Sequence, residues 1–321
     1  MNKRQLGNSG LEVSPLAFGG NIFGWTVDEP ASFCLLDAFV AAGGNFIDTA
    51  DVYSRWAPDN KGGESETILG NWLKRRGNRN QVIIATKVGM EMGPGQKGLS
   101  KAYIQRAVEA SLRRLQTDYI DLYQSHSDDA ETPLAETLET YAGLVKQGKV
   151  RAIGASNYKA ARLREALQIS KQAGYPSYQS LQPNYNLYDR ADYEGALEAV
   201  CREHGLGVIP YFSLASGFLT GKYRKESDLA ESKRGQFVKK YLNARGLRIL
   251  STLEEVARET DSTPATASLA WLFARPSITA PIASATSLDQ LKQLIAATEL
   301  KLGLASVEAL NRASAYSGSA A

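Results

Sequence analysis

Short apolar runs alternate with longer amphipathic segments along most of the 321-residue chain. The short runs are rich in β-branched and aromatic residues, which favour strands, whereas the longer segments repeat apolar positions at helical spacing. This alternation is typical of βαβ units built around a parallel sheet. The short runs predict eight strands, near residues 13–18, 45–48, 82–87, 119–123, 150–154, 180–182, 207–211 and 278–282.

The amphipathic segments predict nine helices that cover this sheet, near residues 31–42, 64–75, 101–115, 133–146, 159–171, 191–204, 246–259, 264–274 and 287–297. Ser100, Thr132 and Thr263 directly precede three of them. A hydroxyl there can accept a hydrogen bond from the first helical turn, so each is a candidate N-cap. Strand–helix repeats of roughly 30 residues predict a closed (β/α)8 TIM barrel, with an open doubly wound sheet as the alternative.

Two segments depart from a bare barrel. Residues 4–13 hold two alternating runs around a Gly/Asn/Ser turn, which predicts an N-terminal β-hairpin that could plug the barrel floor. The spacing between the seventh and eighth strands more than doubles, and residues 216–245 predict an extended loop and helix insertion. Residues 1–321 are expected to form one domain, because barrels of this length commonly do.

Composition narrows the class of protein. Hydrophobic residues make up 43% of the chain and charged residues 22%, near globular averages, so neither disorder nor a coiled coil is predicted. The net charge is +3, and basic and acidic residues are interspersed, which argues against nucleic-acid binding. Residues 1–7 lack the apolar run of a signal peptide, and no stretch approaches membrane-spanning length. We therefore expect a soluble cytoplasmic protein with no membrane partner.

The cysteines and histidines do not suggest a metal site. Cys34 and Cys201 lie far apart within helix-like patterns, so a disulfide framework or zinc site is not predicted and both thiols are expected to be buried. His126 and His204 are too few for a multi-histidine centre. A metal-dependent barrel hydrolase or isomerase would have to use carboxylates alone.

Three predicted strands end near ionisable residues, at Asp48, Lys87 and His126, and Tyr53 follows Asp48 by five residues. Each residue alone has a structural interpretation, as a turn former, a snorkelling lysine, a core histidine or a packing aromatic. Barrel sites lie at the C-terminal ends of the strands, and a buried charge needs a partner. The combination therefore favours one shared chemical site on that rim.

Five blocks occur in order along the chain: residues 45–53 (NFIDTADVY), 85–87 (ATK), 121–126 (DLYQSH), 153–157 (IGASN) and 182–186 (QPNYN). Together they resemble the aldo-keto reductase family, and the resemblance runs from residue 4 to about residue 298. It implies the barrel fold and reversible, NAD(P)H-dependent reduction of aldehydes or ketones to alcohols. It also implies a catalytic tetrad of Asp48, Tyr53, Lys87 and His126.

The chemistry of carbonyl reduction explains why such a tetrad is useful. The reaction needs a hydride, which the nicotinamide would supply, and a proton, which Tyr53 would supply. A tyrosine with a pKa of about 10 donates poorly at neutral pH unless a cation stabilises the phenolate, and Lys87 would be that cation. Asp48 would pair with the ammonium, and His126 would orient the substrate oxygen.

The expected cofactor site is not a Rossmann site, because no Gly-x-Gly-x-x-Gly motif follows a strand. Ser156, Asn157 and Gln182 end predicted strands and suit hydrogen bonds to a nicotinamide carboxamide, and Tyr211 suits stacking on the ring. The resemblance implies these roles. It assigns further cofactor contacts to Gly20, Asn21 and Asp48.

Residues 211–222 (YFSLASGFLTGK) resemble the loop that covers the pyrophosphate in this family, although an ordinary flexible loop is the alternative. Glycines permit close backbone approach there, and a lysine offsets negative charge. The contacts that the resemblance assigns in this loop are Phe212, Ser213, Leu214, Gly217 and Lys222.

Residues 281–291 (PIASATSLDQL) resemble the family's segment for the adenosine 2′-phosphate, with Ser284, Thr286 and Gln290 as contacts. Many relatives have an arginine where this chain has Thr286 or Gln290, and a guanidinium is the strongest phosphate partner. NADPH is the expected cofactor, with NADH possible. The basic residues of the insertion that would compensate are Arg234, Lys239 and Arg245.

Trp25 follows the first strand and Trp56 follows Tyr53, so both are expected to line an aromatic pocket for small apolar or aromatic carbonyl substrates. Packing against neighbouring loops is the alternative for both. The same fold would also suit a cofactor-sensing regulatory subunit similar to the potassium-channel β subunits, which belong to this family. A monomer and a homo-oligomer are both compatible with the sequence.

Overall fold

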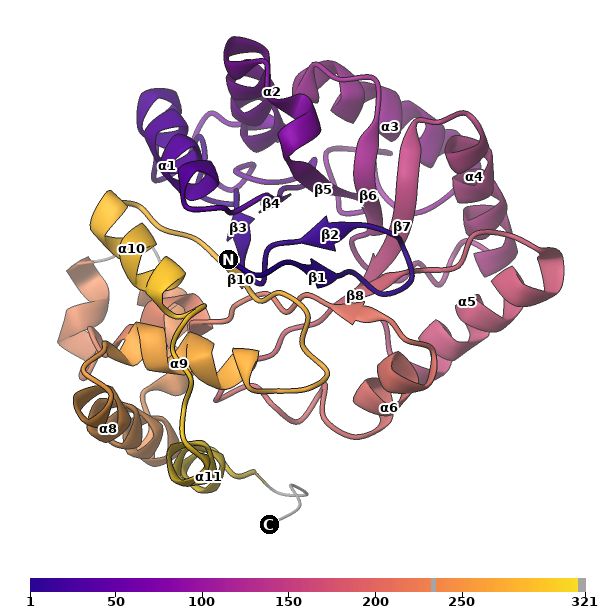
Figure 1. The fold of residues 1–321 in the computed structure, drawn as a ribbon. Coiled ribbons are helices and arrows are strands. Elements are labelled where there is room, and N and C mark those ends of the chain that lie inside the picture. Colours follow the sequence, from indigo (N-terminus) through magenta and orange to yellow (C-terminus); the bar gives the residue numbers. More distant parts are fainter. Residues whose placement is uncertain (232–234, 317–321) are drawn as a thin grey trace.

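The computed structural model describes residues 1–231 and 235–316, and its centre is a parallel sheet in the order β10-β3-β4-β5-β6-β7-β8-β9 (Figure 1). The strands are β3 (Ala17–Gly19), β4 (Phe46–Asp48), β5 (Ile83–Val88), β6 (Ile120–Ser125), β7 (Val150–Ser156), β8 (Ser180–Gln182), β9 (Gly207–Val208) and β10 (Ile282–Ala283). Thr279 N donates to Val208 O at 2.8 Å, and Ile282 N donates to Pro210 O at 2.8 Å. These bonds join the two ends of the strand order, so the predicted closed barrel is confirmed and the open sheet is wrong.

Helices surround the barrel (Figure 1). They are α1 (Glu29–Ala41), α2 (Glu64–Arg76), α3 (Lys101–Leu115), α4 (Leu134–Lys146), α5 (Ala160–Ala173), α6 (Ala196–Glu203), α8 (Ala244–Glu259), α9 (Pro264–Phe273), α10 (Leu288–Ala296) and α11 (Leu304–Ala313). Ser100 and Thr263 cap α3 and α9 as predicted. Thr132 does not cap α4, because its hydroxyl donates to Asp129 at 2.7 Å. Helix α11, which packs against α8, was not predicted.

The hairpin of β1 (Arg4–Gln5) and β2 (Glu12–Val13) crosses one end of the barrel, as Figure 1 shows. Its Leu6 and Leu11 are buried with barrel-facing residues such as Phe46 and Leu122. Gly7 has φ +55°, and a Cβ there would lie 2.2 Å from Gln179 O. The hairpin turn therefore rests directly on the barrel floor, as the sequence predicted.

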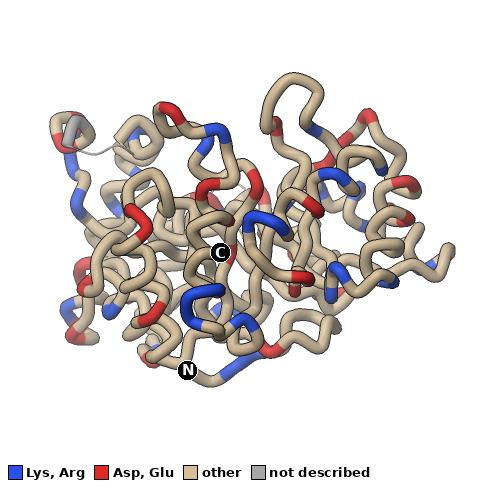
Figure 2. The backbone as a smooth tube through the Cα atoms, turned by 90° about the horizontal axis from the view of Figure 1, so that it is seen from above, with Lys and Arg blue, Asp and Glu red and all other residues tan. Residues whose placement is uncertain are grey.

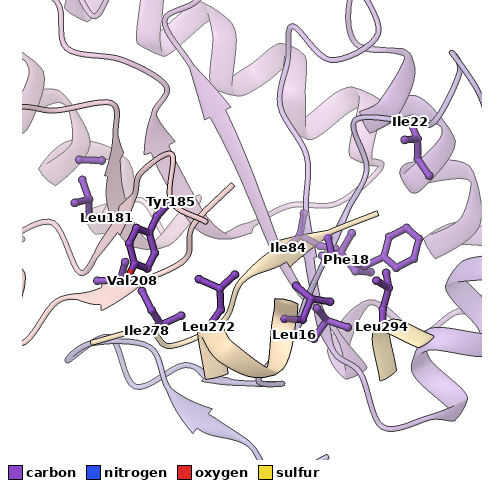
Figure 3. Packing of buried hydrophobic residues seen from close by; sticks show 14 of the residues in the cluster. Leu16, Phe18, Ile22, Ile84, Leu181, Tyr185, Val208, Leu272, Ile278 and Leu294 are labelled. Carbon is purple, nitrogen blue, oxygen red and sulfur yellow. The ribbon is translucent and has the colours of Figure 1, made fainter. Parts of the chain in front are cut away.

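A larger apolar layer separates the strands from the helices. Side chains on the outer face of the sheet, such as Phe18 and Ile84, are fully buried in it together with helical residues such as Trp72 and Trp271. Figure 3 shows part of this layer, including Phe18, Ile84 and Leu294 of α10. Burial of apolar surface contributes about 25 cal/mol per Å², so this layer stabilises the packing of the helices on the barrel.

The predicted insertion between the seventh and eighth barrel strands, β9 and β10, is confirmed. It begins with short helical turns: η2 (Ala215–Thr220), η3 (Glu226–Glu231), α7 (Gly235–Val238) and η4 (Lys239–Tyr241). The ring of Phe218 stacks on Tyr241 with centroids 5.4 Å apart. That contact fastens the start of the insertion to its end, next to α8.

Charged residues of both signs are interspersed over the surface, as Figure 2 shows. Cys201 is buried as expected, but Cys34 is exposed because it lies on the solvent side of α1. Over the described ranges, no helix combines the length and apolar character needed to cross a membrane.

Candidate active site

The C-terminal ends of three adjacent strands bring the predicted polar residues together. Asp48 is the last residue of β4, and Lys87 lies near the end of β5. His126 directly follows β6, and its backbone N donates to Val88 O at 2.9 Å. Parallel pairing of β4, β5 and β6 thus places all three on one rim.

Lys87 is the centre of a buried hydrogen-bond network. Its Nζ lies 2.8 Å from Asp48 Oδ2, 2.8 Å from the Tyr53 hydroxyl and 2.7 Å from Thr49 O. An ammonium has three donors, and all three are used here. Burial lowers the pKa of Lys87, and the charge of Asp48 opposes that shift. The ion pair with Asp48 allows Lys87 to stay charged although its side chain has no exposed surface.

Asp48 accepts hydrogen bonds at both carboxylate oxygens. Tyr53 donates to Oδ2 at 3.0 Å, and Gln182 Nε2 donates to Oδ1 at 2.9 Å. Gln182 also contacts Gln124 Oε1 at 3.5 Å. Gln182, the predicted carboxamide ligand, therefore also holds Asp48, a role that was not predicted from the sequence.

Tyr53 lies at the wall of a cavity, in the loop that follows β4. Burial, followed by the nearby charge of Asp48, raises its pKa well above the ordinary value of 10. The sequence predicts the opposite influence, a lowering of the Tyr53 pKa by Lys87. Burial and Asp48 together keep the hydroxyl protonated at neutral pH, while Lys87 Nζ stays 2.8 Å from the oxygen.

His126 faces Tyr53 with ring centroids 6.0 Å apart and is 9% exposed. Burial lowers its pKa well below 6.5, and the charge of Lys87 acts in the same direction. The imidazole is therefore neutral at physiological pH. A neutral imidazole can donate one hydrogen bond without adding a second positive charge to the site.

A cavity of about 920 Å³ extends from Tyr53 and His126 toward the loop after β9 and the start of α10. Most of the site residues named from the sequence line it: Asn21, Tyr53, Trp56, His126, Ser156, Asn157, Gln182, Tyr211, Phe212, Ser213, Leu214, Gly217, Lys222, Ser284, Thr286 and Gln290. The lining residues that sequence reasoning missed are Ile22, Thr26, Val52, Met90, Glu91, Ser216, Thr220, Ala265, Ile282, Ala283, Gln293 and Leu294.

Polar groups gather next to His126 at the inner end of this cavity. Asn157 Nδ2 donates to His126 O at 2.9 Å, and its Oδ1 accepts from the Tyr211 hydroxyl at 2.8 Å. Ser156 Oγ donates to Gln182 O at 2.8 Å. These bonds orient the amide of Asn157 and the ring of Tyr211 beside the buried network.

The loop after β9 has an unusual backbone. Phe212, Ala215 and Ser216 have φ of +53°, +48° and +57°, and Gly217 has φ +98°. Such left-handed positions are costly for residues other than glycine and cluster at functional sites. The Phe212 carbonyl accepts a hydrogen bond from Asn186 Nδ2 at 3.0 Å, which helps to hold the loop against the cavity.

The outer end of the cavity carries little charge. Gln290 Oε1 accepts hydrogen bonds from Thr286 N at 2.9 Å and Thr286 Oγ1 at 3.1 Å, and both side chains are exposed. Among the described lining residues, Lys222 is the one lysine or arginine, and Glu91 is the one aspartate or glutamate. The outer end thus presents mainly uncharged hydrogen-bonding groups.

Lys239 and Arg245, two of the three basic residues proposed as compensation, do not line the cavity. Lys239 pairs with Glu226 at 3.5 Å. Arg245 donates to the carbonyls of Ser314 and Ala315 at 2.6 and 3.0 Å, so it fastens the segment after α11. Arg234 lies outside the described residues.

Asp48 and Lys87 do not line the cavity, and neither do two other expected contacts, Gly20 and Trp25. A Cβ on Gly20 would lie 2.9 Å from Ser65 Oγ and 3.1 Å from Asp48 O, so this glycine permits close packing of β3 against β4 and α2. Trp25 contacts Trp56 edge-on, with centroids 5.7 Å apart, and Trp56 is the one that lines the cavity.

Met90 and Glu91 were not named from the sequence, although they lie only a few residues after Lys87. Their position directly after a barrel strand was the available signal. Within the described part of the chain, no three His, Cys, Asp or Glu side chains come together as a metal site would require.

Comparison with known proteins adds to this geometry. A family model described as "Aldo/keto reductase family" matches residues 15–315. "Uncharacterized oxidoreductase YrpG" of Bacillus subtilis (strain 168) is 34% identical over 319 residues, which cover 97% of this chain and 95% of that protein. "Protein tas" of Escherichia coli (strain K12) is 32% identical over 344 aligned positions, covering 98% and 99% of the two chains. "Probable voltage-gated potassium channel subunit beta" of Oryza sativa subsp. japonica is 32% identical over 308 residues, covering 94% and 92%.

Proposed function

Since this chain belongs to the aldo/keto reductase family, which indicates an oxidoreductase that uses a nicotinamide cofactor, we propose that it reversibly reduces aldehydes or ketones to alcohols. One observation carries the proposal. The Tyr53 hydroxyl lies at the cavity wall, 2.8 Å from Lys87 Nζ and 3.0 Å from Asp48 Oδ2. A protonated phenol next to a fixed ammonium is the arrangement that proton donation to a carbonyl oxygen requires.

The proposed mechanism assigns one task to each residue. The cofactor, when bound, supplies a hydride to the carbonyl carbon. Tyr53 turns its hydroxyl proton from Asp48 toward the substrate oxygen and transfers it there. Lys87 stabilises the phenolate that remains, and Asp48 holds the ammonium in place. Neutral His126 orients the substrate oxygen by a hydrogen bond.

The residues that line the cavity fit a nicotinamide dinucleotide. The volume of the cavity, about 920 Å³, lies within the range of cofactor pockets. Ser156, Asn157 and Gln182 would bind the carboxamide, and Tyr211 would stack on the nicotinamide ring. The remaining candidate contacts toward the phosphates and adenosine are Asn21, Phe212, Ser213, Leu214, Gly217, Lys222, Ser284, Thr286 and Gln290.

NADPH is the first choice of cofactor in this proposal, and NADH is the second. NADH is favoured by the outer end of the cavity, where Thr286 and Gln290 lie and no described lining residue is an arginine. A 2′-phosphate there would meet neutral donors and not a bidentate guanidinium. Fluorescence titration with both cofactors distinguishes the two.

The proposed substrates are small apolar or aromatic carbonyl compounds. Trp56 is 48% exposed and contacts Tyr53 edge-on with centroids 6.0 Å apart, and Phe212 is 47% exposed in the same cavity. Exposed aromatic rings beside a polar centre favour ligands with an apolar body. We further propose that residues 1–321 act as one domain in the cytoplasm.

The test of this function is Tyr53→Phe, which removes the proton donor and keeps the ring. We expect turnover to fall by roughly 10²- to 10⁴-fold, the usual contribution of general acid catalysis. Quenching by the cofactor should remain unchanged. Tyr119→Phe is the matched control, because its ring lies under Arg79 and outside the cavity lining. Near wild-type turnover by Tyr53→Phe on every substrate reduced would contradict the proposal.

A second candidate function is a cofactor-sensing regulatory subunit. It is favoured by the 32% identity to the rice protein named as a probable potassium-channel β subunit. Such a protein would bind the cofactor but turn it over slowly with every member of a carbonyl panel. Rapid steady-state turnover would argue against this alternative.

A further inference from the structure

A group of buried and half-buried polar residues lies next to β5 outside the cavity lining, and the proposed mechanism does not use it. Asp51 follows β4 and is 2% exposed. Its backbone N contacts Lys87 O at 3.3 Å, so the acid is attached directly to the strand that carries the catalytic lysine. Glu66 of α2 and Arg114 of α3 complete the group.

Glu66 has partners for both carboxylate oxygens. It accepts hydrogen bonds from Arg114 Nε at 2.7 Å and from Thr86 Oγ1 at 2.5 Å, and its side chain has no exposed surface. Thr86 directly precedes Lys87. The Glu66 carboxylate therefore ties α2 and α3 to β5 at the position next to the lysine.

Asp51 has no comparable partners. Across residues 1–231 and 235–316, neither of its carboxylate oxygens finds a hydrogen-bond partner of normal geometry. A buried acid without partners is costly in its charged form and is retained most easily when neutral. The fold thus contains a buried proton-binding group directly behind Lys87.

The groups around Asp51 come from every neighbouring element. Burial and the negative charge of Glu66 raise the pKa of Asp51 to about 8, against the lowering influence of Arg114, the Val52 N–H and Lys87. The charge of Asp51 in turn raises the pKa of Lys87. The charge of Asp51 also acts on Tyr103 of α3, Tyr123 of β6 and Tyr141 of α4.

We propose that Asp51 is a positioning residue that acts through Lys87, neutral in the working enzyme and ionised under alkaline conditions to help the ammonium keep its proton. The inference rests on the proposed function, because the charge of Lys87 matters only if Tyr53 delivers a proton. As the pH rises through about 8, Asp51 loses its proton and becomes negatively charged. This charge raises the pKa of Lys87, against the lowering effect of burial. The alkaline limit of catalysis is therefore extended.

The Asp51→Asn variant keeps the shape and removes the charge. Below about pH 7 the variant and the wild type carry the same charge here, so kcat/KM should be equal. At about pH 9 the variant should be slower by about tenfold, which corresponds to one pKa unit of Lys87. Asp59→Asn is the matched control, because Asp59 is an exposed acid in the same loop.

A second readout does not depend on turnover. The pKa of Lys87, followed by NMR of its labelled ε-carbon, should be lower in Asp51→Asn than in wild type and unchanged in Asp59→Asn. If Asp51→Asn does not fold, the carboxyl carbon of Asp51 is followed in the wild type. A titration near pH 8 is expected there, and one in the ordinary range of aspartate overturns the inference.

The outcomes separate the inference from the proposed function. An equal loss of kcat/KM at every pH would indicate packing alone and overturn the role, as would an unchanged titration of Lys87. If the wild type reduces no carbonyl compound but the Lys87 titration shifts as expected, the coupling stands and the proposed function falls.

Discussion

The two ends of the cavity are built differently. At the inner end, Asp48 and Lys87 are completely buried, and each donor of the ammonium has an acceptor within 2.8 Å. At the outer end, Thr286 and Gln290 are exposed and uncharged and bond mainly to each other. The inner end is held by interactions that are costly to break, whereas the outer end can change with little cost to the fold.

The largest effect should follow from breaking the inner end with Lys87→Met. This change leaves the Asp48 carboxylate buried without its ion partner, which typically costs about 3–5 kcal/mol. We expect the free energy of unfolding, measured in urea, to fall by about that amount, together with near-complete loss of carbonyl reduction. Lys74→Met, at an exposed position of α2, should stay within about 0.5 kcal/mol of wild type. A loss no larger than the control's would mean that the pair is not held as described.

A smaller effect should follow at the inner end when the pH is lowered, because His126 is buried there. The folded pKa of His126 lies below its unfolded value of 6.5, so the unfolded chain binds the extra proton as the pH falls. Stability should therefore be lost below pH 6.5, by up to about 1.4 kcal/mol per pH unit. In His126→Gln this part of the acid-side loss should disappear.

His204→Gln is the matched control for that measurement, because His204 lies at the end of α6 and its side chain is 34% exposed. It should keep the acid-side loss, since His126 is still present. Chemical denaturation from about pH 7.5 to about pH 5 compares the three proteins. Parallel stability curves for wild type and His126→Gln would show that the imidazole is not held neutral.

The inner end was largely predictable from the sequence. Asp48, Lys87 and His126 end strands whose pattern is clear, and parallel strands must present their C-terminal ends on one rim. What could not be predicted was the balance of interactions around each residue. The raised pKa of Tyr53 depends on how deeply the loop after β4 buries the hydroxyl.

Features that depend on distant packing were missed for a related reason. Helix α11 spans ten residues and buries Leu310 and Ala313, so its apolar face is short and gives a weak signal in the sequence. Asp51 has the sequence appearance of a polar turn residue. Its environment becomes evident only when the fold brings Glu66 and Arg114, from two later helices, close enough to influence its charge.

The smallest effect should come from Thr286→Arg, which adds a positive charge at the outer end of the cavity. A guanidinium there offers a 2′-phosphate a charge-assisted hydrogen bond, worth about 1.5–3 kcal/mol in general and less at an exposed site. We expect the ratio of NADPH to NADH affinity, measured by fluorescence titration, to rise by about tenfold. Thr286→Gln, which adds length without charge, should leave the ratio near that of wild type. If Thr286→Arg increased the affinity for NADPH and NADH equally, the new charge would be acting on the pyrophosphate that both cofactors share. The outer end of the cavity would then not be the part that distinguishes NADPH from NADH. A selective gain with unchanged stability would instead show that cofactor choice can be altered at the exposed end without disturbing the buried end that carries the chemistry.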